Sequence, residues 1–352
     1  MKLAKLRDVL KERELDALLI TSGYNRRYMT NFTGTAGIAV VSENDAVFIT
    51  DFRYMEQAAE QVKDFRIVQH EKTIIEEVAE QVKAMKISRL GFEKEDLTYG
   101  MYELYKSNVD AELVPTAGLV EKLRIVKTPE ELEILRQAAK IADDAFTHIC
   151  GYIKPGMTEL EVANELEFFM RKQGAASSSF DTIVASGVRG ALPHGVASDK
   201  KIQSGELVTM DYGALYNGYI SDITRTVAVG EPTEQMREIY EITLAAQKLA
   251  VEGFKPGMTG READAIARDY ITEKGYGDAF GHSTGHGIGL EVHEAPGLSS
   301  RSDMVLEPNM TVTAEPGIYL PGIGGVRIED DLVITENGCE RLTHSTKELQ
   351  IL

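Results

Sequence analysis

The chain lacks the features that mark secreted and membrane-bound proteins. Its two cysteines, Cys150 and Cys339, are too few for a disulfide framework and do not have the spacing of a zinc site. No stretch approaches the roughly 18 to 20 apolar residues that span a bilayer. Residues 1–15 alternate charged and apolar side chains, whereas a signal peptide would have a continuous apolar core. We therefore expect a cytoplasmic protein with reduced thiols.

Positive charge is also scarce. The 38 Lys and Arg residues face 56 Asp and Glu residues, and the formal net charge is -18. Because so acidic a surface repels phosphate groups and anionic lipids, we expect neither nucleic acid nor a membrane as a partner. Two explanations fit the acid excess: it keeps the protein soluble, or part of it lies inside the protein around cations.

The length of 352 residues suggests two domains. Residues 1–124 alternate helix and strand patterns, which predicts a three-layer α/β domain with a mixed or parallel sheet. A new helix then begins, in which Thr128 is the cap, Pro129 the first residue and Glu131 the partner in a capping box. We therefore place the domain boundary between residues 124 and 125.

Residues 125–352 contain an internal repeat. The sequence KPGMT occurs at residues 154–158 and again at residues 255–259, and each copy follows one long helix pattern and begins another. Strand patterns follow both copies. Two halves of this kind predict a single α+β domain with an internal pseudo-two-fold axis.

Each half of the repeat contributes two acidic residues. Asp211 and Glu315 end equivalent strand patterns, while Asp222 and Glu329 lie on the strands that turn back. An acidic pair on a hairpin is more often a solvated edge, but the apolar residues before Asp211 indicate burial here. Four buried carboxylates near one axis would repel each other. Two divalent cations would neutralise them, so we predict two metal ions.

The first hairpin can be placed in register. The Asn-Gly pair at residues 217–218 is a strong signal for a two-residue turn, and this turn sets Asp211 opposite Thr224. Because side chains alternate between the two faces of a strand, Asp222 is then the diagonal neighbour of Asp211. The two carboxylates are therefore expected within reach of one ion.

Four histidines of the second part lie near glycines: His194, His282, His286 and His293. Glycine lets the backbone approach an ion closely, so we expect these histidines beside the acidic cluster. Four carboxylates with one or two imidazoles form a hard, oxygen-rich ligand set. Such a set suits Mn²⁺, with Co²⁺, Zn²⁺ or Fe²⁺ as other candidates.

These motifs resemble the M24-type pita-bread metallopeptidases, specifically the branch of prolidase (Xaa-Pro dipeptidase) and aminopeptidase P. The matching segments of the second part are residues 192–195 (LPHG), 210–213 (MDYG), 221–226 (SDITRT), 282–289 (HSTGHGIG), 292–294 (VHE), 314–317 (AEPG) and 326–330 (VRIED). The first part resembles the N-terminal domain of the same branch at residues 31–35 (NFTGT) and 50–54 (TDFRY). The resemblance implies a creatinase-like α/β domain over residues 1–124 and a pita-bread catalytic domain over residues 125–352.

The resemblance also implies the metal ligands. Asp222 and Glu329 are expected to bridge two metal ions, Asp211 to complete the shell of one ion, and His286 and Glu315 to complete that of the other. Glu315 is also the expected acceptor of a proton from a water between the ions, whose pKa the metals would lower.

The remaining site residues are assigned in the same way. His194 and His293 are expected to contact the substrate carbonyl and the tetrahedral intermediate. His282 and Arg327 are expected nearby as groups on the substrate side. Thr224 is expected to orient Asp222 without binding a metal ion itself.

The activity that the resemblance implies is hydrolysis of Xaa-Pro dipeptides by a homodimer, in which the N-terminal domain helps to cover the partner's site. Aminopeptidase P shares every ligand and acts on longer Xaa-Pro peptides, so it stays open as the alternative. The modest chain length and the compact N-terminal domain favour the dipeptidase. A more distant alternative is a binding module without peptidase activity. Such modules, like the creatinase-like hydrolases, tend to lose the metal ligands, and methionine aminopeptidases typically lack the N-terminal domain.

Overall fold

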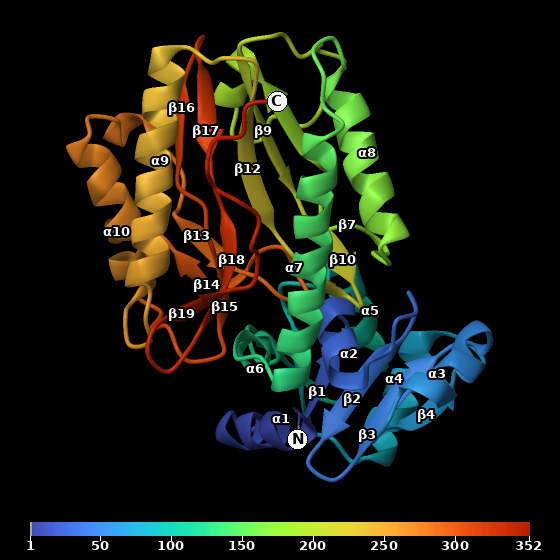
Figure 1. Cartoon of the computed structure of the whole chain (residues 1–352). Helices are drawn as coiled ribbons and strands as arrows, with labels where there is room; N and C mark the ends of the chain where they lie inside the picture. Colours follow the sequence, from blue (N-terminus) through green and yellow to red (C-terminus); the bar gives the residue numbers. More distant parts are fainter. Residues whose placement is uncertain (1) are drawn as a thin grey trace. The chain divides into compact units, whose positions relative to one another are not determined.

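A computed structural model describes residues 2–352 of the protein, and the chain divides into two compact units (Figure 1). The first unit ends at Arg124, and the second runs from Ile125 to Leu352. Within residues 2–352, no helix combines the length and the apolar character that crossing a membrane requires.

The first unit is built on a six-stranded mixed sheet with the strand order β4-β3-β2-β1-β5-β6. The β1–β2 and β2–β3 pairs are antiparallel, and the β3–β4, β1–β5 and β5–β6 pairs are parallel. The residues of β1, β2 and β3 are buried on both faces of the sheet. The elements are α1 (Lys2–Glu12), β1 (Ala17–Ile20), α2 (Gly23–Thr30), β2 (Ile38–Ser42), β3 (Ala46–Thr50), η1 (Phe52–Tyr54), α3 (Met55–Gln61), β4 (Arg66–Gln69), α4 (Ile74–Ala84), β5 (Arg89–Glu93), α5 (Tyr99–Asn108), β6 (Glu112–Thr116) and α6 (Glu121–Ile125), the last of which ends one residue into the second unit.

The first half of the second unit packs two helices against two small antiparallel sheets, ordered β12-β9-β8 and β11-β10-β7. Thr128 and Thr158 cap these helices, and each forms the predicted kind of capping box with a glutamate three residues later. The elements are α7 (Pro129–Cys150), α8 (Glu159–Lys172), β7 (Ser177–Ser178), β8 (Ile183–Ser186), η2 (Gly187–Ala191), β9 (Glu206–Tyr212), β10 (Ala214–Tyr216), β11 (Tyr219–Ile220) and β12 (Ile223–Val229).

The second half repeats this plan with a five-stranded sheet, β14-β13-β15-β18-β19, and the hairpin β16-β17. In Figure 1 the helix pair α9–α10 and the helix pair α7–α8 lie on opposite sides of the strands. The elements are α9 (Glu234–Gly253), α10 (Gly260–Glu273), η3 (Gly277–Ala279), β13 (Gly285–Gly287), β14 (Glu294–Leu298), β15 (Thr311–Ala314), β16 (Gly317–Leu320), β17 (Gly324–Arg327), β18 (Asp330–Ile334) and β19 (Cys339–Arg341).

The hydrogen bonds at the two helix starts show the internal repeat directly. The Glu159 N–H donates to the Lys200 carbonyl at 3.0 Å, and at the equivalent place the Gly260 N–H donates to the Met304 carbonyl at 2.9 Å. Equivalent segments of the two halves therefore cross the starts of α8 and α10. The expected pita-bread architecture with a pseudo-two-fold repeat is confirmed.

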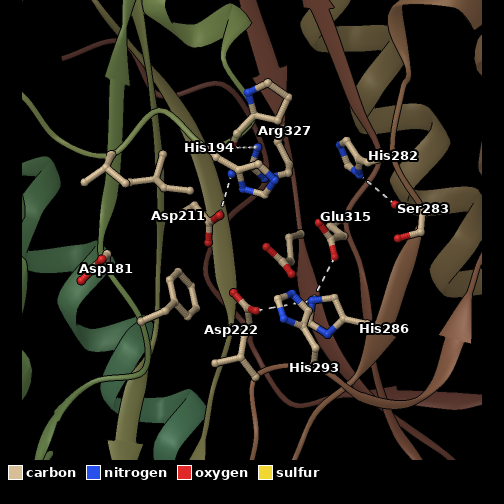
Figure 2. Close-up of a pocket in the computed structure, with 16 residues that line it drawn as sticks. Asp181, His194, Asp211, Asp222, His282, Ser283, His286, His293, Glu315 and Arg327 are labelled. Carbon is tan, nitrogen blue, oxygen red and sulfur yellow. Dashed lines mark hydrogen bonds and ion pairs between the residues drawn. The ribbon is translucent and has the colours of Figure 1, made fainter.

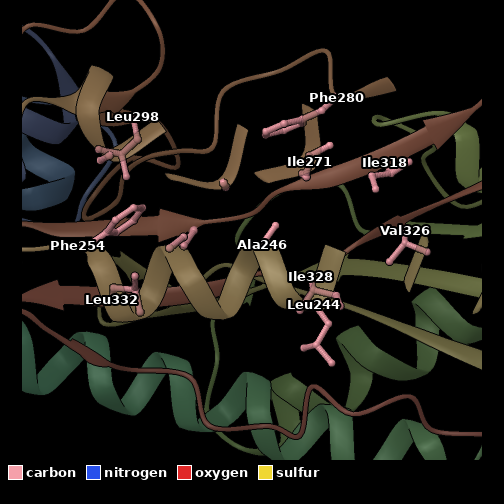
Figure 3. Close-up of a cluster of buried hydrophobic side chains, with 14 of the residues drawn as sticks. Leu244, Ala246, Phe254, Ile271, Phe280, Leu298, Ile318, Val326, Ile328 and Leu332 are labelled. Atoms are coloured by element: carbon pink, nitrogen blue, oxygen red, sulfur yellow. The ribbon is translucent and has the colours of Figure 1, made fainter. Parts of the chain in front are cut away.

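An apolar cluster makes the strands of the second half a rigid support (Figure 3). Phe254 at the end of α9 is 1% exposed, and it belongs to one cluster with Ile318, Val326 and Ile328 from the segments that flank the acidic residues. Because a well-packed core transmits strain and resists small displacements, this cluster fixes the backbone from which Glu315 and Glu329 project.

Candidate metal centre

The first hairpin has the predicted register. Thr224 of β12 lies opposite Asp211 of β9, and the pairing continues without interruption to Val229 opposite Glu206. The turn at residues 217–218 needs a positive φ at both positions, and Asn217 and Gly218 have φ values of 47° and 83°. Local turn chemistry therefore sets which side chains of this hairpin face the centre of the domain.

The four predicted carboxylates and His286 line one cavity of about 740 Å³. They come from both halves of the repeat, and Figure 2 shows the labelled side chains of Asp211, Asp222, Glu315 and His286 directed toward a common centre. Asp222, His286 and Glu329 each offer a ligand atom within 4.8 Å of the others. The His286 Nε2 atom lies 3.2 Å from Glu315 Oε1 and 3.8 Å from Asp222 Oδ2.

Two buried carboxylate oxygens in this cluster have no hydrogen-bond partner among residues 2–352. These are Asp211 Oδ1 and Asp222 Oδ1. A buried acceptor without a partner is costly and needs an explanation. Oxygen atoms of this kind, converging from two strands, are the donors that a hard divalent cation takes, so the residues present fit a metal site.

The charges of the cluster explain why a cation would bind there. Burial, followed by the charges of Glu329 and Asp211, raises the pKa of Asp222 well above its usual range. Burial, followed by the charges of Glu315 and Asp211, does the same to the pKa of Glu329. Like charges at close range oppose each other's ionisation, and a divalent cation would reverse that opposition.

His286 and Glu315 form the one mutually stabilised pair of the cluster. Although burial opposes ionisation of both groups, the hydrogen bond and charge of His286 lower the pKa of Glu315 to about 2. The same contact raises the pKa of His286. Its Nδ1 atom lies 3.1 Å from the Gly287 carbonyl, so Nδ1 carries a proton and Nε2 faces the cluster. A metal ion would take the place of the proton that Nε2 shares with Glu315.

Thr224 contacts a different carboxylate from the expected one. Its hydroxyl donates to Glu329 Oε2 at 2.6 Å and accepts a hydrogen bond from Arg327 Nε at 3.1 Å. Because this contact crosses between the two halves of the repeat, the register of a single hairpin could not show it. Thr224 therefore holds Glu329 directly, and its expected role in orienting Asp222 stays a prediction.

Arg327 and Tyr319 connect the metal cluster with the substrate side of the cavity. Arg327 Nη2 donates to Asp211 Oδ2 at 2.6 Å, and Arg327 Nη1 donates to the Tyr319 hydroxyl at 2.9 Å. The Tyr319 hydroxyl also lies 2.8 Å from His282 Nε2. Burial raises the pKa of Tyr319 to about 12, so the hydroxyl stays protonated. Sequence analysis missed Tyr319, although it lies only four residues after Glu315 on β16.

The other two predicted histidines lie at the mouth of the same cavity. His194 and His293 are both exposed, and both line the cavity. The ring of His293 lies 4.4 Å from the ring of His286, measured between ring centroids. The buried side chain of Glu294 stabilises the loop that carries His293. Its carboxylate accepts the Leu290 N–H and forms an ion pair with Lys127 at 3.2 Å.

Comparison with known proteins agrees with this geometry. The model of metallopeptidase family M24 matches residues 133–336, and the model of the creatinase/prolidase N-terminal domain matches residues 2–126. The chain belongs to metallopeptidase family M24. As a member of that family it is a metal-dependent peptidase that works with divalent metal ions.

Three relatives show how closely the whole chain is matched. A solved structure of an Xaa-Pro dipeptidase from Bacillus anthracis is 63% identical with a TM-score of 0.99, covering 100% of this chain and 99% of that one. An Xaa-Pro dipeptidase of Pyrococcus furiosus is 47% identical, covering 99% of both chains. A crystal structure of an X-Pro aminopeptidase from Thermotoga maritima is 42% identical with a TM-score of 0.92, covering 97% of this M24 peptidase and 99% of that chain.

Proposed function

We propose that this M24 peptidase is an Xaa-Pro dipeptidase that uses two divalent metal ions, most readily Mn²⁺. The observation that carries the proposal is the convergence of four buried carboxylates and His286 on one cavity, with two carboxylate oxygens left without a hydrogen-bond partner among residues 2–352. Asp222 and Glu329 would bridge the ions, Asp211 would complete one shell, and His286 and Glu315 the other. The oxygen-rich donor set favours Mn²⁺, with Co²⁺, Zn²⁺ or Fe²⁺ as alternatives.

The metal ions would lower the pKa of a water molecule, so that a nucleophile exists near neutral pH. Glu315 is the proposed proton acceptor, and Thr313 holds one of its oxygens through a 3.1 Å hydrogen bond. His194 and His293 would donate to the developing oxyanion of the substrate carbonyl. Arg327 and His282 would bind on the substrate side, held together by the Tyr319 hydroxyl.

The apolar part of the cavity lining supports a proline-containing substrate. Phe180, Ile183, Val196 and Val292 line the same cavity as the metal cluster. Proline has a compact apolar ring and no amide hydrogen, so an apolar wall can bind it without leaving a buried donor or acceptor unpaired. Binding energy from such a wall would help to position the bond for cleavage.

A length series of substrates tests the proposal. Metal-depleted protein should be inactive, and Mn²⁺ should restore cleavage of Ala-Pro with much weaker cleavage of Ala-Pro-Ala. Equal rates on the two peptides would instead identify an Xaa-Pro aminopeptidase, the candidate that the Thermotoga maritima structure supports. No cleavage of either peptide by the metal-loaded protein would reject both activities.

We further propose that the protein works as a homodimer in the cytoplasm. The support is the resemblance of residues 31–35 and 50–54 to the N-terminal domain of the prolidase branch, in which that domain helps to cover the partner's site. Light scattering after size exclusion would test the dimer, and a mass equal to one chain at micromolar concentration would reject it.

A further inference from the structure

One fully buried carboxylate lies outside the proposed metal centre. Glu159 is the first residue of α8, and its side chain is 0% exposed. One of its oxygens accepts the N–H and the hydroxyl of Ser186, each at 2.8 Å. The other accepts the N–H of Ser198 at 3.1 Å and its hydroxyl at 2.6 Å. Glu159 therefore binds both ends of the loop formed by residues 186–198.

Arg189 completes this arrangement from inside the loop. Its Nη1 atom forms an ion pair with the second oxygen of Glu159. Its Nη2 atom donates to the Val196 carbonyl at 2.9 Å. Because a guanidinium holds its donors in a rigid fork, Arg189 fixes the distance between Glu159 and the segment that contains His194.

The internal repeat shows that the fold does not need an acid at this position. The residue equivalent to Glu159 in the second half is Gly260, which begins α10 in the same way. Helix capping does not need it either, because Glu161 and Glu262 form the capping boxes of the two helices. Glu159 is thus a departure from the repeat, and its contacts lie in the loop that carries His194.

His194 depends on that loop for its position. Its imidazole makes no hydrogen bond to any other side chain or backbone group of residues 2–352. The neighbouring Pro193 carbonyl accepts a hydrogen bond from Arg327 Nη1 at 3.2 Å. Gly190 packs so closely on Gly325 of β17 that an added Cβ would lie 3.1 Å from the Gly325 nitrogen. The backbone of the loop, anchored at these points, is what directs the imidazole into the cavity.

We propose that Glu159 and Arg189 are positioning residues for His194. The pair clamps the loop of residues 186–198 onto the start of α8, and the clamped loop holds the imidazole where it meets the substrate carbonyl. The inference rests on the proposed peptidase function, because His194 has its role only in that reaction. Displacement of a catalytic group by about 1 Å can cost about a hundredfold in rate. Loosening the loop that carries His194 should therefore lower the rate of peptide cleavage measurably.

A double-mutant cycle tests the connection between the pair and His194. Glu159→Gln is expected to lower kcat/KM on Ala-Pro by about 10- to 100-fold, with two metal ions per chain retained. Glu161→Gln, which alters the same helix turn but not the loop, should stay within about twofold of the wild type. In a His194→Ala background, Glu159→Gln should lower kcat/KM by no more than about twofold. A further large loss in that background, or a loss of metal, would overturn the proposal.

Hydrogen exchange provides a readout that does not depend on activity. Glu159→Gln should accelerate exchange of the amides of residues 186–198, whereas Glu161→Gln should not; unchanged exchange in Glu159→Gln would overturn the clamp. If the wild type cleaves neither peptide, the peptidase function fails while this measurement still decides whether the clamp exists. Should Glu159→Gln not fold, Ser198→Ala removes the hydroxyl that donates to Glu159 and accepts the Lys200 N–H, and it should show smaller losses with the same dependence on His194.

Discussion

Replacing Glu329 by glutamine should make the metal-free protein more stable and remove most of its stabilisation by metal. Glu329 is 2% exposed, and burial together with the charges of Glu315 and Asp211 raises its pKa well above the usual range. Glutamine has nearly the same shape, and its carbonyl oxygen can still accept the hydrogen bond from Thr224. The substitution therefore removes an unfavourable buried charge while it keeps the local contact.

Glu329→Gln should raise the free energy of unfolding without metal and lower the stabilisation that metal adds, and the two changes should be of similar size. Relief of the buried charge should stabilise the metal-free protein by about 1–3 kcal/mol, the usual cost of a poorly satisfied buried polar group. Metal at a hundred times its Kd stabilises the wild type by about 2.7 kcal/mol per site. For a unit the size of Ile125–Leu352, 1 kcal/mol corresponds to roughly 2–4 °C in Tm, so each bound ion should raise Tm by about 5–11 °C.

Thermal unfolding with and without Mn²⁺ measures both effects. Glu336→Gln, at an exposed position in the turn between β18 and β19, is the matched control and should leave both values unchanged. A Glu329→Gln protein that is less stable than the wild type without metal, and that keeps the full metal-induced shift, would refute the reasoning about charge repulsion.

The pH dependence has a definite sign. A carboxyl whose pKa is raised in the folded state stabilises the protein while it is protonated, and that contribution is lost as the pH rises through the folded-state pKa. The metal-free wild type should therefore lose stability from about pH 4 upward. The metal-free Glu329→Gln protein should lose less stability over the same pH range. The difference in stability between the two proteins should disappear at lower pH.

Three further outcomes are expected. Asp222→Asn should lower kcat by at least about a thousandfold, because the proposed bridging ligand is lost, while circular dichroism stays unchanged. Thr224→Val should weaken metal binding by about 10- to 100-fold, since Glu329 loses its orienting hydrogen bond; calorimetric titration with Mn²⁺ measures this, and an unchanged Kd would contradict it. Asp330→Asn should destabilise the fold by about 3–5 kcal/mol in urea unfolding, because it removes the buried negative charge that pairs with Arg225, Arg341 and Lys347.

The sequence was most informative where local chemistry decides the structure. The turn at residues 217–218 fixed the register that sets Asp211 opposite Thr224, and the capping box at Thr128 located the start of α7. In the first unit the sequence signal for β4 is weak, because Arg66–Gln69 is an edge strand with two exposed polar residues and no apolar alternation. The signal for helix α2 is weak for a related reason: it buries the polar residues Asn25 and Arg26, and Arg26 donates hydrogen bonds to the carbonyls of Gly34 and Gly37.

Contacts between the two halves of the second unit could not be predicted in the same way. The period of a strand tells which side chains share its face, but not what another strand presents to that face. Thr224 meets Glu329 across the halves, and Arg327 reaches Asp211 in the other half. Tyr319 joins this network through its hydroxyl, which contacts both His282 and Arg327. Each of these contacts depends on how two hairpins meet, which is a property of packing and not of spacing.

The repeat itself explains why its symmetry predicts the acidic ligands but not the supports of the histidines. The second half fixes the loop of His282 through Asp264, which accepts the Thr284 N–H at 2.9 Å, and through Arg268, which donates to the His282 carbonyl at 2.6 Å. At the places equivalent to Asp264 and Arg268 the first half has Ala163 and Glu167, so it cannot form that pair. It fixes the loop of His194 instead with an acid at the start of α8, where the second half has glycine. Each half therefore supports its histidine loop with a buried carboxylate paired with an arginine. The two pairs lie at positions that are not equivalent in the repeat, so superposing one half on the other would not reveal both.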